Sequence, residues 1–510
     1  MHTLSPSKKI LTAAVMYSLL AVSPVWAANQ TATTTVTGSN TAATPYISIA
    51  VSQDPTASDY ETLAVSHENT DAMTVYMAPG GTVSVTSKGT SDYAADTKGV
   101  KNEVGGALTI AGDLDLTSTA ATADSSVADP SASDAASAYG IDQTITLTDD
   151  ADTNSGTVTV TGATKLNVSA TGGGVTESGT ADYTNAYAYG INNATDNIDP
   201  NGSRIPERAT MSLGAVSGSV TAAGGTANVA SSSSNDAYAE AYGVENMGVL
   251  TLDSVDLTVE AKGGTIAAGT GTANAYAYGI ETYVDSENGS NSKLAIAGTT
   301  NLQVKAVAGN PSGEGKITNS YAVAYGVNNY PMTASNYDVM NTGAITATVT
   351  AQAGTVNTNG SYINSQAYGL CANGGVTTGA LDLTVTATGG TVSGTTNNTA
   401  NTASASTDAE GLWNNNNSTI QINGNTTLKV TATGSTATEG GALRYNDVYA
   451  AGTDIYNGAT LTLQDLTATV SASGGSSTEV NGIYMGYGSM TVENLDRKST
   501  RLNSSHSRAS

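Results

Sequence analysis

Tyrosine is the residue type with the most regular placement in this chain of 510 residues. The sequence holds 25 Tyr and no Phe, which indicates rings whose hydroxyl ends meet water or a polar partner. Many of the rings recur in Ala-Tyr-Gly segments with one strand parity. They therefore form either a structural ladder or a surface that stacks on sugars or host proteins. The candidates for ligand stacking are Tyr187, Tyr189, Tyr238, Tyr242, Tyr276, Tyr278, Tyr321, Tyr325 and Tyr368.

The pattern does not decide which face of the strands these tyrosines occupy. Glu240, Gln366 and Glu410 share their parity, which indicates an outer face. The aliphatic residue after the glycine, such as Ile191, indicates an inner face, unless the glycine hosts a bulge that changes the parity. Both interpretations stay open.

The nucleophilic and basic side chains of the sequence do not indicate a hydrolytic active site. Once both ends are set aside, His67 is the only histidine, so a Ser-His-Asp triad or a multi-histidine metal site would have to be built around it. We expect His67 to be a structural or solvated residue in a polar loop. Cys371 directly follows a Tyr-Gly-Leu segment and is expected to fill a small strand position.

Carboxylate chemistry is the alternative, because pairs of acidic residues cleave polysaccharides. Such a site needs several acids converging on one strand face, whereas the acids of this chain are scattered. We therefore expect no catalysis and no cofactor. The scattered acids are Asp149, Asp150, Asp152, Asp196, Asp199 and Glu240.

Residues 150–156 resemble the start of a calcium-binding loop, with side-chain oxygens at the first, third and fifth positions. The glycine falls one place late, and Thr161 stands where the closing glutamate belongs. We expect an ordinary polar turn without metal ligands, and weak calcium binding is the alternative.

The tyrosine segments belong to an internal repeat whose marker is a glycine, in most copies directly after tyrosine. Successive marker glycines are 30 to 53 residues apart, so the differences in length are expected to fall in loops. The marker glycines are Gly99, Gly140, Gly190, Gly243, Gly279, Gly326, Gly369, Gly411, Gly452 and Gly482.

Each repeat contains three strand-like pieces. The tyrosine segment comes first, and a short apolar piece such as residues 249–252 follows it. The third piece alternates most strictly: in residues 257–264, Leu, Val and Ala lie on one face, and Thr, Glu and Lys lie on the other. This alternation is typical of half-buried strands, and a glycine pair then ends the strand.

One repeat cannot bury its own apolar face, whereas stacked copies can. We therefore predict an all-β fold, a right-handed parallel β-helix or β-solenoid of ~40-residue repeats, with one coil per repeat and long loops. Two shorter coils per repeat are the alternative. Disorder is the rival interpretation, because runs of Thr, Ser, Gly and Asn suit a flexible stalk. The period of two and the low charge, 12% of residues, favour the solenoid.

The two ends differ from the repeats. Residues 1–27 are predicted to be a secretory signal peptide, with Lys8 and Lys9 before an apolar run and Ala27 at the cleavage site. The run is short for a bilayer span, and we expect no transmembrane segment in the mature chain. Residues 496–510 hold four Arg or Lys and resemble one reading frame of a sequencing-library adapter. We expect this tail to be an artefact and the authentic chain to continue.

Composition limits the partners and the source of stability. Residues 28–495 carry 12 basic against 42 acidic side chains, and so acidic a surface is repelled by nucleic acid and by anionic membranes. A single Cys excludes an intrachain disulfide framework. Regular structure must therefore supply the stability.

The chain resembles the passenger region of a bacterial autotransporter in three respects: its signal peptide, its Thr/Ala/Gly/Asn composition, and its Leu-x-Val-x-Ala-x-Gly-Gly repeats over residues 99–495. The resemblance implies an exported β-helix that a C-terminal outer-membrane β-barrel displays on the cell surface. We expect this barrel, which the sequence lacks, to be the missing C-terminal partner of the chain.

The resemblance divides the chain into a signal peptide (1–27), a partly irregular N-terminal passenger segment (28–98), a repetitive β-helix (99–495) and the artefact (496–510). It implies a structural or adhesive protein at the cell surface, in the outer membrane or outside the cell. Its partners are expected to be surface glycans or proteins of host or neighbouring cells. A barrel-free secreted repeat protein and, less favoured, a β-helical polysaccharide-active enzyme are the alternatives.

Overall fold

The structure is a computed structural model. It describes residues 30–53, 61–89, 95–103, 105–122, 135–145, 155–175, 182–195, 209–230, 235–282, 292–330, 339–394, 401–438 and 440–494. All the regular secondary structure in these ranges is β-strand, and neighbouring strands in the sheets pair in parallel. The fold is therefore all-β, as predicted. The signal peptide (1–27) and the adapter-like tail (496–510) lie outside the described residues.

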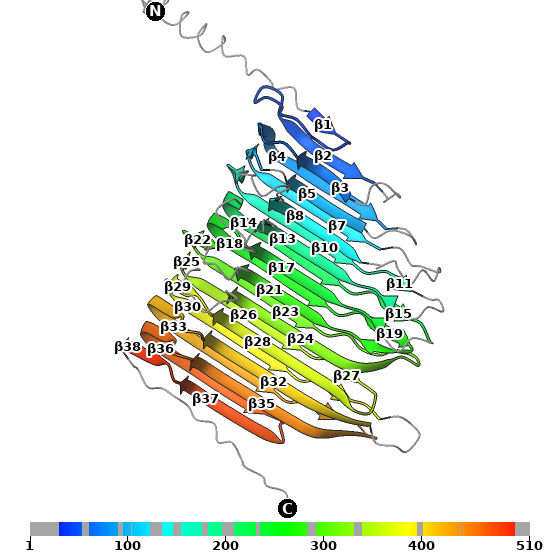
Figure 1. The fold of residues 1–510 in the computed structure, drawn as a ribbon, viewed down its shortest axis with the longest axis vertical. Coiled ribbons are helices and arrows are strands. Elements are labelled where there is room, and N and C mark those ends of the chain that lie inside the picture. The colour runs from blue at the N-terminus through cyan, green and yellow to red at the C-terminus, as the bar shows by residue number, and fades with distance from the viewer. Residues whose placement is uncertain are drawn as a thin grey trace, which may run out of the picture.

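Successive repeats form successive coils of a parallel β-solenoid. Each strand pairs with its equivalent in the coil before and in the coil after, so that Tyr189 lies between Tyr139 and Tyr242. The colour in Figure 1 accordingly runs from blue to red along the long axis of the molecule. This register confirms one coil per repeat, because the marker segments of consecutive repeats are direct neighbours.

The strands with the marker segments form one face of the solenoid, which we call the tyrosine sheet. Its 11 main strands follow one another in chain order, each from a different coil. They are β3 (Glu61–His67), β5 (Ala95–Asn102), β8 (Ala136–Ile145), β13 (Ala186–Thr195), β17 (Ala239–Asn246), β21 (Ala275–Thr282), β24 (Lys316–Asn329), β28 (Ser361–Ala372), β32 (Asn401–Asn414), β35 (Gly441–Tyr456) and β37 (Ser477–Gly486).

The short apolar pieces and the strictly alternating pieces form two further faces, joined in one 18-stranded sheet. They are joined because several long strands bend from one face into the other; the strand 209–223, for example, pairs with 156–160 and then with 164–171. The strands are β1 (Gln30–Ala32), β2 (Tyr46–Ser52), β4 (Ala72–Lys88), β6 (Ala107–Ala111), β7 (Leu114–Ala121), β9 (Gly156–Val160), β10 (Thr164–Thr171), β14 (Ala209–Ala223), β18 (Val249–Lys262), β22 (Lys293–Ile296), β23 (Thr300–Val307), β25 (Val339–Thr342), β26 (Ile345–Gln352), β29 (Gly375–Thr378), β30 (Leu381–Thr388), β33 (Thr419–Thr433), β36 (Thr460–Ser473) and β38 (Ser489–Asn494).

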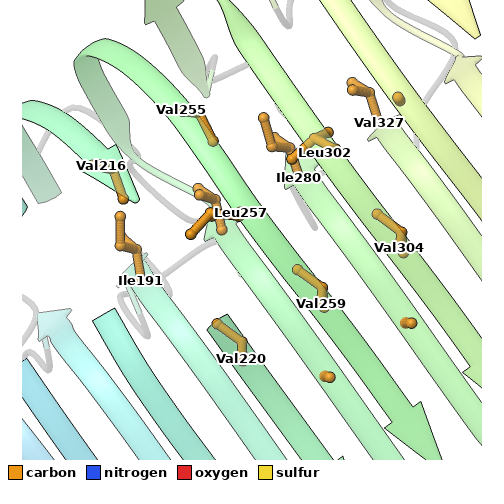
Figure 2. Packing of buried hydrophobic residues seen from close by; sticks show 14 of the residues in the cluster. Ile191, Val216, Val220, Val255, Leu257, Val259, Ile280, Leu302, Val304 and Val327 are labelled. Carbon is orange, nitrogen blue, oxygen red and sulfur yellow. The ribbon is translucent and has the colours of Figure 1, made fainter. Parts of the chain in front are cut away.

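The three faces enclose a continuous apolar core. In β18, Leu257 and Val259 are buried, whereas Thr258 between them is exposed, as the alternation predicts. Val220, Val259 and Val304 hold the same place in three consecutive coils and point into the interior in Figure 2. Burial of each such side chain contributes roughly 1.5–3 kcal/mol. Repetition over many coils therefore stabilises a core that is thin in cross-section.

The marker glycines stand where the backbones of consecutive coils approach closely. A Cβ atom on Gly243 would lie 2.4 Å from the carbonyl oxygen of Gly279 in the next coil. At the far end of the column, a Cβ atom on Gly482 would meet nothing within 4 Å. A side chain at Gly243 is opposed because the blocking atom belongs to the backbone of the neighbouring coil. We call the marker glycines, from Gly99 to Gly482, the glycine ladder.

A lateral ridge, which the sequence analysis did not predict, lies at one corner of the coils. It carries its own small apolar core, which includes Ile266, Ile317 and Val356. Several of its strands are labelled at the right-hand edge of Figure 1. The ridge strands form two three-stranded sheets, of β11 (Gly174–Val175), β15 (Thr226–Asn228) and β19 (Thr265–Ala268), and of β27 (Thr355–Val356), β31 (Thr391–Val392) and β34 (Thr436–Ala437). Three further short strands, β12 (Asp182–Tyr183), β16 (Asn235–Asp236) and β20 (Thr270–Thr272), pair with one another and join the tyrosine sheet through β24.

Much of the segment 28–98, expected to be partly irregular, is also built into the solenoid. β2 and β4 belong to the 18-stranded sheet, and β3 and β5 belong to the tyrosine sheet. The first coil lacks the marker because Ala64, between Leu63 and Val65, takes the place opposite Gly99. The same change of parity occurs in this coil at an alanine, because the adjacent Ala64 and Val65 are both fully buried.

Candidate functional site: the tyrosine face

Six tyrosines form a stack along the tyrosine sheet. Each directly precedes a marker glycine, and they come from six consecutive coils. Neighbouring ring centroids lie 4.6 to 5.2 Å apart, and the ring planes differ by only 4 to 13°. We call this stack the tyrosine ladder. Its members are Tyr139, Tyr189, Tyr242, Tyr278, Tyr325 and Tyr368.

The tyrosines point outward, and a change of parity at the glycine explains the conflicting sequence signals. In β13, Ala186 and Ala188 are fully buried, whereas Tyr189 is only half-buried. The pairing then passes over Gly190, and Ile191 is fully buried in the core. The glycine therefore turns the strand so that an outward tyrosine and an inward aliphatic residue lie two positions apart.

The stacking determines what the ladder can bind. The rings cover one another's faces, so each inner ring presents mainly its edge and its hydroxyl group. A sugar that stacks on an aromatic ring needs an uncovered face. The geometry therefore favours a structural role for Tyr189, Tyr242, Tyr278, Tyr325 and Tyr368 among the nine ligand-stacking candidates.

The other four candidates stand in a looser column nearer the start of each strand. Tyr187 and Tyr276 flank Tyr238 with ring planes tilted by 44° and 35°. Tyr321 is tilted by 54° against Tyr362, which is itself exposed. We call Tyr187, Tyr238, Tyr276 and Tyr321 the tilted tyrosines. Tilted, half-buried rings leave part of each face open to a ligand.

A buried carboxylate joins the two columns. Tyr238 and Tyr242 donate their hydroxyl hydrogens to Glu240 over 2.8 and 2.6 Å. Burial raises the pKa of Glu240, and the two hydrogen bonds oppose that rise. Burial also raises the pKa of the Tyr242 hydroxyl. Both phenols therefore stay protonated at neutral pH and keep donating to Glu240. The three side chains form a hydrogen-bonded brace that links the tyrosine ladder to Tyr238.

Two further carboxyls of this face are shifted toward the protonated form. Burial raises the pKa of Glu281 to about 7, although Asn328 donates a hydrogen bond to it over 2.7 Å. Glu410 follows the last ring of the ladder, and burial raises its pKa well above the usual range. A carboxyl taken out of water prefers its neutral form. The tyrosine face therefore loses negative charge as the pH falls.

A row of buried amides runs beneath the outer face, three residues after the marker glycines of four consecutive coils, from Gly99 to Gly243. Asn102, Gln143, Asn193 and Asn246 bond one another from coil to coil over 2.8 to 3.2 Å. His67, 3% exposed, begins the row with a 2.8 Å bond to Asn102. His67 is therefore a structural residue inside β3, and the expectation of a polar loop was wrong. We call this row the amide ladder.

The amide ladder was not predicted from the sequence, although the sequence contains a signal for it. Segments such as Gly-Ile-Asn-Asn (190–193) and Gly-Val-Glu-Asn (243–246) place an amide at the same offset from the marker glycine. In a single strand this amide looks like an ordinary polar turn residue. Its partners come from neighbouring coils, so the signal is visible only once the coils are aligned.

A compact group of charges ends the tyrosine ladder on its N-terminal side. Lys98 lies opposite Tyr139, with its ammonium 5.1 Å from the ring centroid. It also pairs with Glu61 at 2.9 Å and with Asp142 at 2.8 Å. Lys101 pairs with Glu61 at 2.7 Å. These ion pairs are largely buried. They fix Lys98 over the face of the Tyr139 ring that is not stacked on Tyr189.

The remaining chemical candidates do not converge on a site. Cys371 is buried in β28, as expected, and burial raises the pKa of its thiol, which disfavours the reactive thiolate. Within the described ranges, no three His, Cys, Asp or Glu side chains gather where they could hold a metal ion. Residues 150–154 of the calcium-like loop lie outside these ranges, as do Asp149, Asp196 and Asp199.

Comparisons with known proteins add no family. No protein-family model, curated protein or solved structure matches the chain. In the part of the chain that the structure covers, no helix is long and apolar enough to cross a membrane.

Proposed function

We propose that this chain is the exported passenger region of a bacterial autotransporter, displayed on the cell surface or released from it. Its role is structural and adhesive, without catalysis. The signal peptide and the repeat composition support export, and a stack of similar coils is the architecture that the resemblance implies. Each coil adds ~4.8 Å of length, so the solenoid holds its surfaces away from the cell.

The observation that carries the adhesive role is the position of the tilted tyrosines. They stand on neighbouring coils beside a rigid ladder, with their ring faces partly open. Aromatic rings with a polar end are common anchors for sugars and for protein surfaces. The brace at Glu240 holds Tyr238 in place, and a preorganised anchor loses little freedom on binding.

The test is binding of the purified chain to intact cells, compared with a triple variant Tyr187→Ser, Tyr276→Ser and Tyr321→Ser. We expect the variant to lose at least tenfold in bound protein while its circular dichroism is unchanged. A matched control carries Tyr484→Ser and Tyr487→Ser, at side chains that are 37% and 94% exposed in the last described coil. Equal binding of the triple variant and the control would reject the tilted tyrosines as the adhesive surface.

A further inference from the structure

A polar cavity of about 270 Å³ lies where the tyrosine ladder meets the charge group of Lys98. Its walls come from three consecutive coils, through β5, β8 and β13. Its volume is just below the ~300–1,000 Å³ of pockets that hold drug-sized ligands. The cavity therefore suits one small ring. Its lining residues are Lys98, Lys101, Glu103, Tyr139, Asp142, Thr144 and Asn192.

The charged side chains that line the cavity balance one another, and Glu61 behind them adds one negative charge. Among the lining side chains, Lys98 and Lys101 are positive, and Glu103 and Asp142 are negative. Lys101 pairs with Glu103 at 2.7 Å. Behind the wall, Glu61 is bonded to both lysines. A strongly charged ligand would have to break these pairs, so the cavity favours an uncharged one.

The hydrogen-bonding groups are arranged for a ligand that both donates and accepts. Asn192 is 8% exposed and donates to Asp142 over 2.9 Å, while its carbonyl oxygen has no partner. Thr144 also donates to Asp142, over 3.1 Å. The two ammonium groups supply donors, and the Glu103 carboxylate and the Thr144 and Tyr139 hydroxyl oxygens supply acceptors. An apolar ligand would leave these groups unpaired.

Tyr139 gives the cavity its one aromatic wall. Its ring stacks on Tyr189 at 4.6 Å on one side and faces the Lys98 ammonium on the other. It therefore presents an edge and a hydroxyl group to the cavity. An uncharged ligand of one ring, rich in hydroxyl groups, satisfies each of these features.

We infer that this cavity binds a single neutral sugar residue, such as the terminal hexose of a surface glycan. The Thr144 hydroxyl oxygen accepts hydrogen bonds from the hydroxyl groups of the ring, Asp142 and Asn192 hold Thr144 in place, and the two lysines donate from the opposite wall. The inference rests on the proposed adhesive function only in naming a cell-surface glycan as the source. It adds a second site, separate from the tilted tyrosines.

The test is calorimetric titration of the full chain with glucose, galactose and mannose, and with glucuronate and glucosamine as charged counterparts. We expect at least one neutral hexose to bind with a Kd of about 1 mM or tighter, and the charged sugars to bind at least tenfold more weakly. The variants Thr144→Val and Asn192→Ala should each weaken binding by roughly fivefold or more. Thr258→Val, on the exposed face of β18, is the matched control and should bind as the parent does.

Three results would overturn the inference: flat titrations with every neutral hexose, preferential binding of glucuronate, or unchanged affinity in both cavity variants. Circular dichroism of each variant separates loss of the site from loss of the fold, and Thr144→Val nearly preserves side-chain volume. The two proposals fail separately. Sugar binding without attachment to cells rejects the adhesive function alone, whereas attachment with flat titrations rejects the cavity alone.

Discussion

The glycine ladder gives the sharpest test of the coil-to-coil packing, through Gly243→Ala and Gly482→Ala. At Gly243 the new methyl group would lie 2.4 Å from the Gly279 carbonyl oxygen and 2.8 Å from a Val259 methyl carbon. The oxygen belongs to the backbone of the next coil, so the strands must separate to admit the methyl group. At Gly482 the same methyl group would meet no atom within 4 Å.

Overpacking of this kind costs roughly 1–3 kcal/mol. Alanine also restricts the unfolded chain, which raises the free energy of unfolding by about 0.4–1 kcal/mol. Neither glycine has a left-handed backbone conformation, which would disfavour alanine. We therefore expect Gly243→Ala to lower the free energy of unfolding by about 1.3 kcal/mol. Gly482→Ala should leave the free energy of unfolding unchanged or raise it by less than about 1 kcal/mol.

Hydrogen exchange followed by mass spectrometry is the suitable assay, because coils of a solenoid can open locally and a single unfolding midpoint averages over them. A loss of about 1.3 kcal/mol corresponds to roughly ninefold faster exchange. This acceleration should be confined to peptides of β17 and β21. Equal exchange in the two variants, or normal protection of β17 in Gly243→Ala, would refute the close approach.

Four further predictions follow from the same coils. Val259→Asp should unfold its coil, because it buries an unpaired charge, whereas Thr258→Asp should be mild; local hydrogen exchange compares them. The raised pKa of Glu281, about 7, means that the folded chain binds the proton more tightly, so stability should fall as pH rises from about 4 to 7. Urea midpoints at pH 5 and pH 8 should differ less in Glu281→Gln. Asn193→Ala removes the hydrogen bonds to Gln143 and Asn246, whose freed atoms keep only longer bonds to the backbone, and should cost about 1–3 kcal/mol in urea unfolding. N-terminal sequencing of the exported protein should start at Ala28, and a retained leader would contradict the signal peptide.

Local alternation was sufficient to predict the strands and their inward residues. Leu257 and Val259 are buried as the period of two required, and consecutive marker segments are neighbours as the repeat required. These features depend on one strand and on its copies. They can be predicted because each repeat places the same residue types at the same positions of the core.

The tyrosine face could be predicted only in part, because its geometry depends on pairs of coils. The change of parity at Gly190 follows from the backbone contact with Gly243 in the next coil. The ion pair between Lys98 and Asp142 also crosses from one coil to the next. Two residues about forty positions apart carry no mutual signal until the register of the coils is known.

The glycine ladder also bears on how the length of such a chain can change. Any stretch from one marker glycine to the next carries a complete set of complementary surfaces for a neighbour on either side. An in-frame duplication of one stretch would therefore insert a coil that fits both neighbours, and a deletion would bring two compatible coils together. The spacings of 36 residues from Gly243 to Gly279 and 53 from Gly190 to Gly243 show that each stretch also tolerates a loop of its own size. The length of the solenoid can thus change by unequal crossing-over, in steps of ~4.8 Å, without a new hydrophobic core.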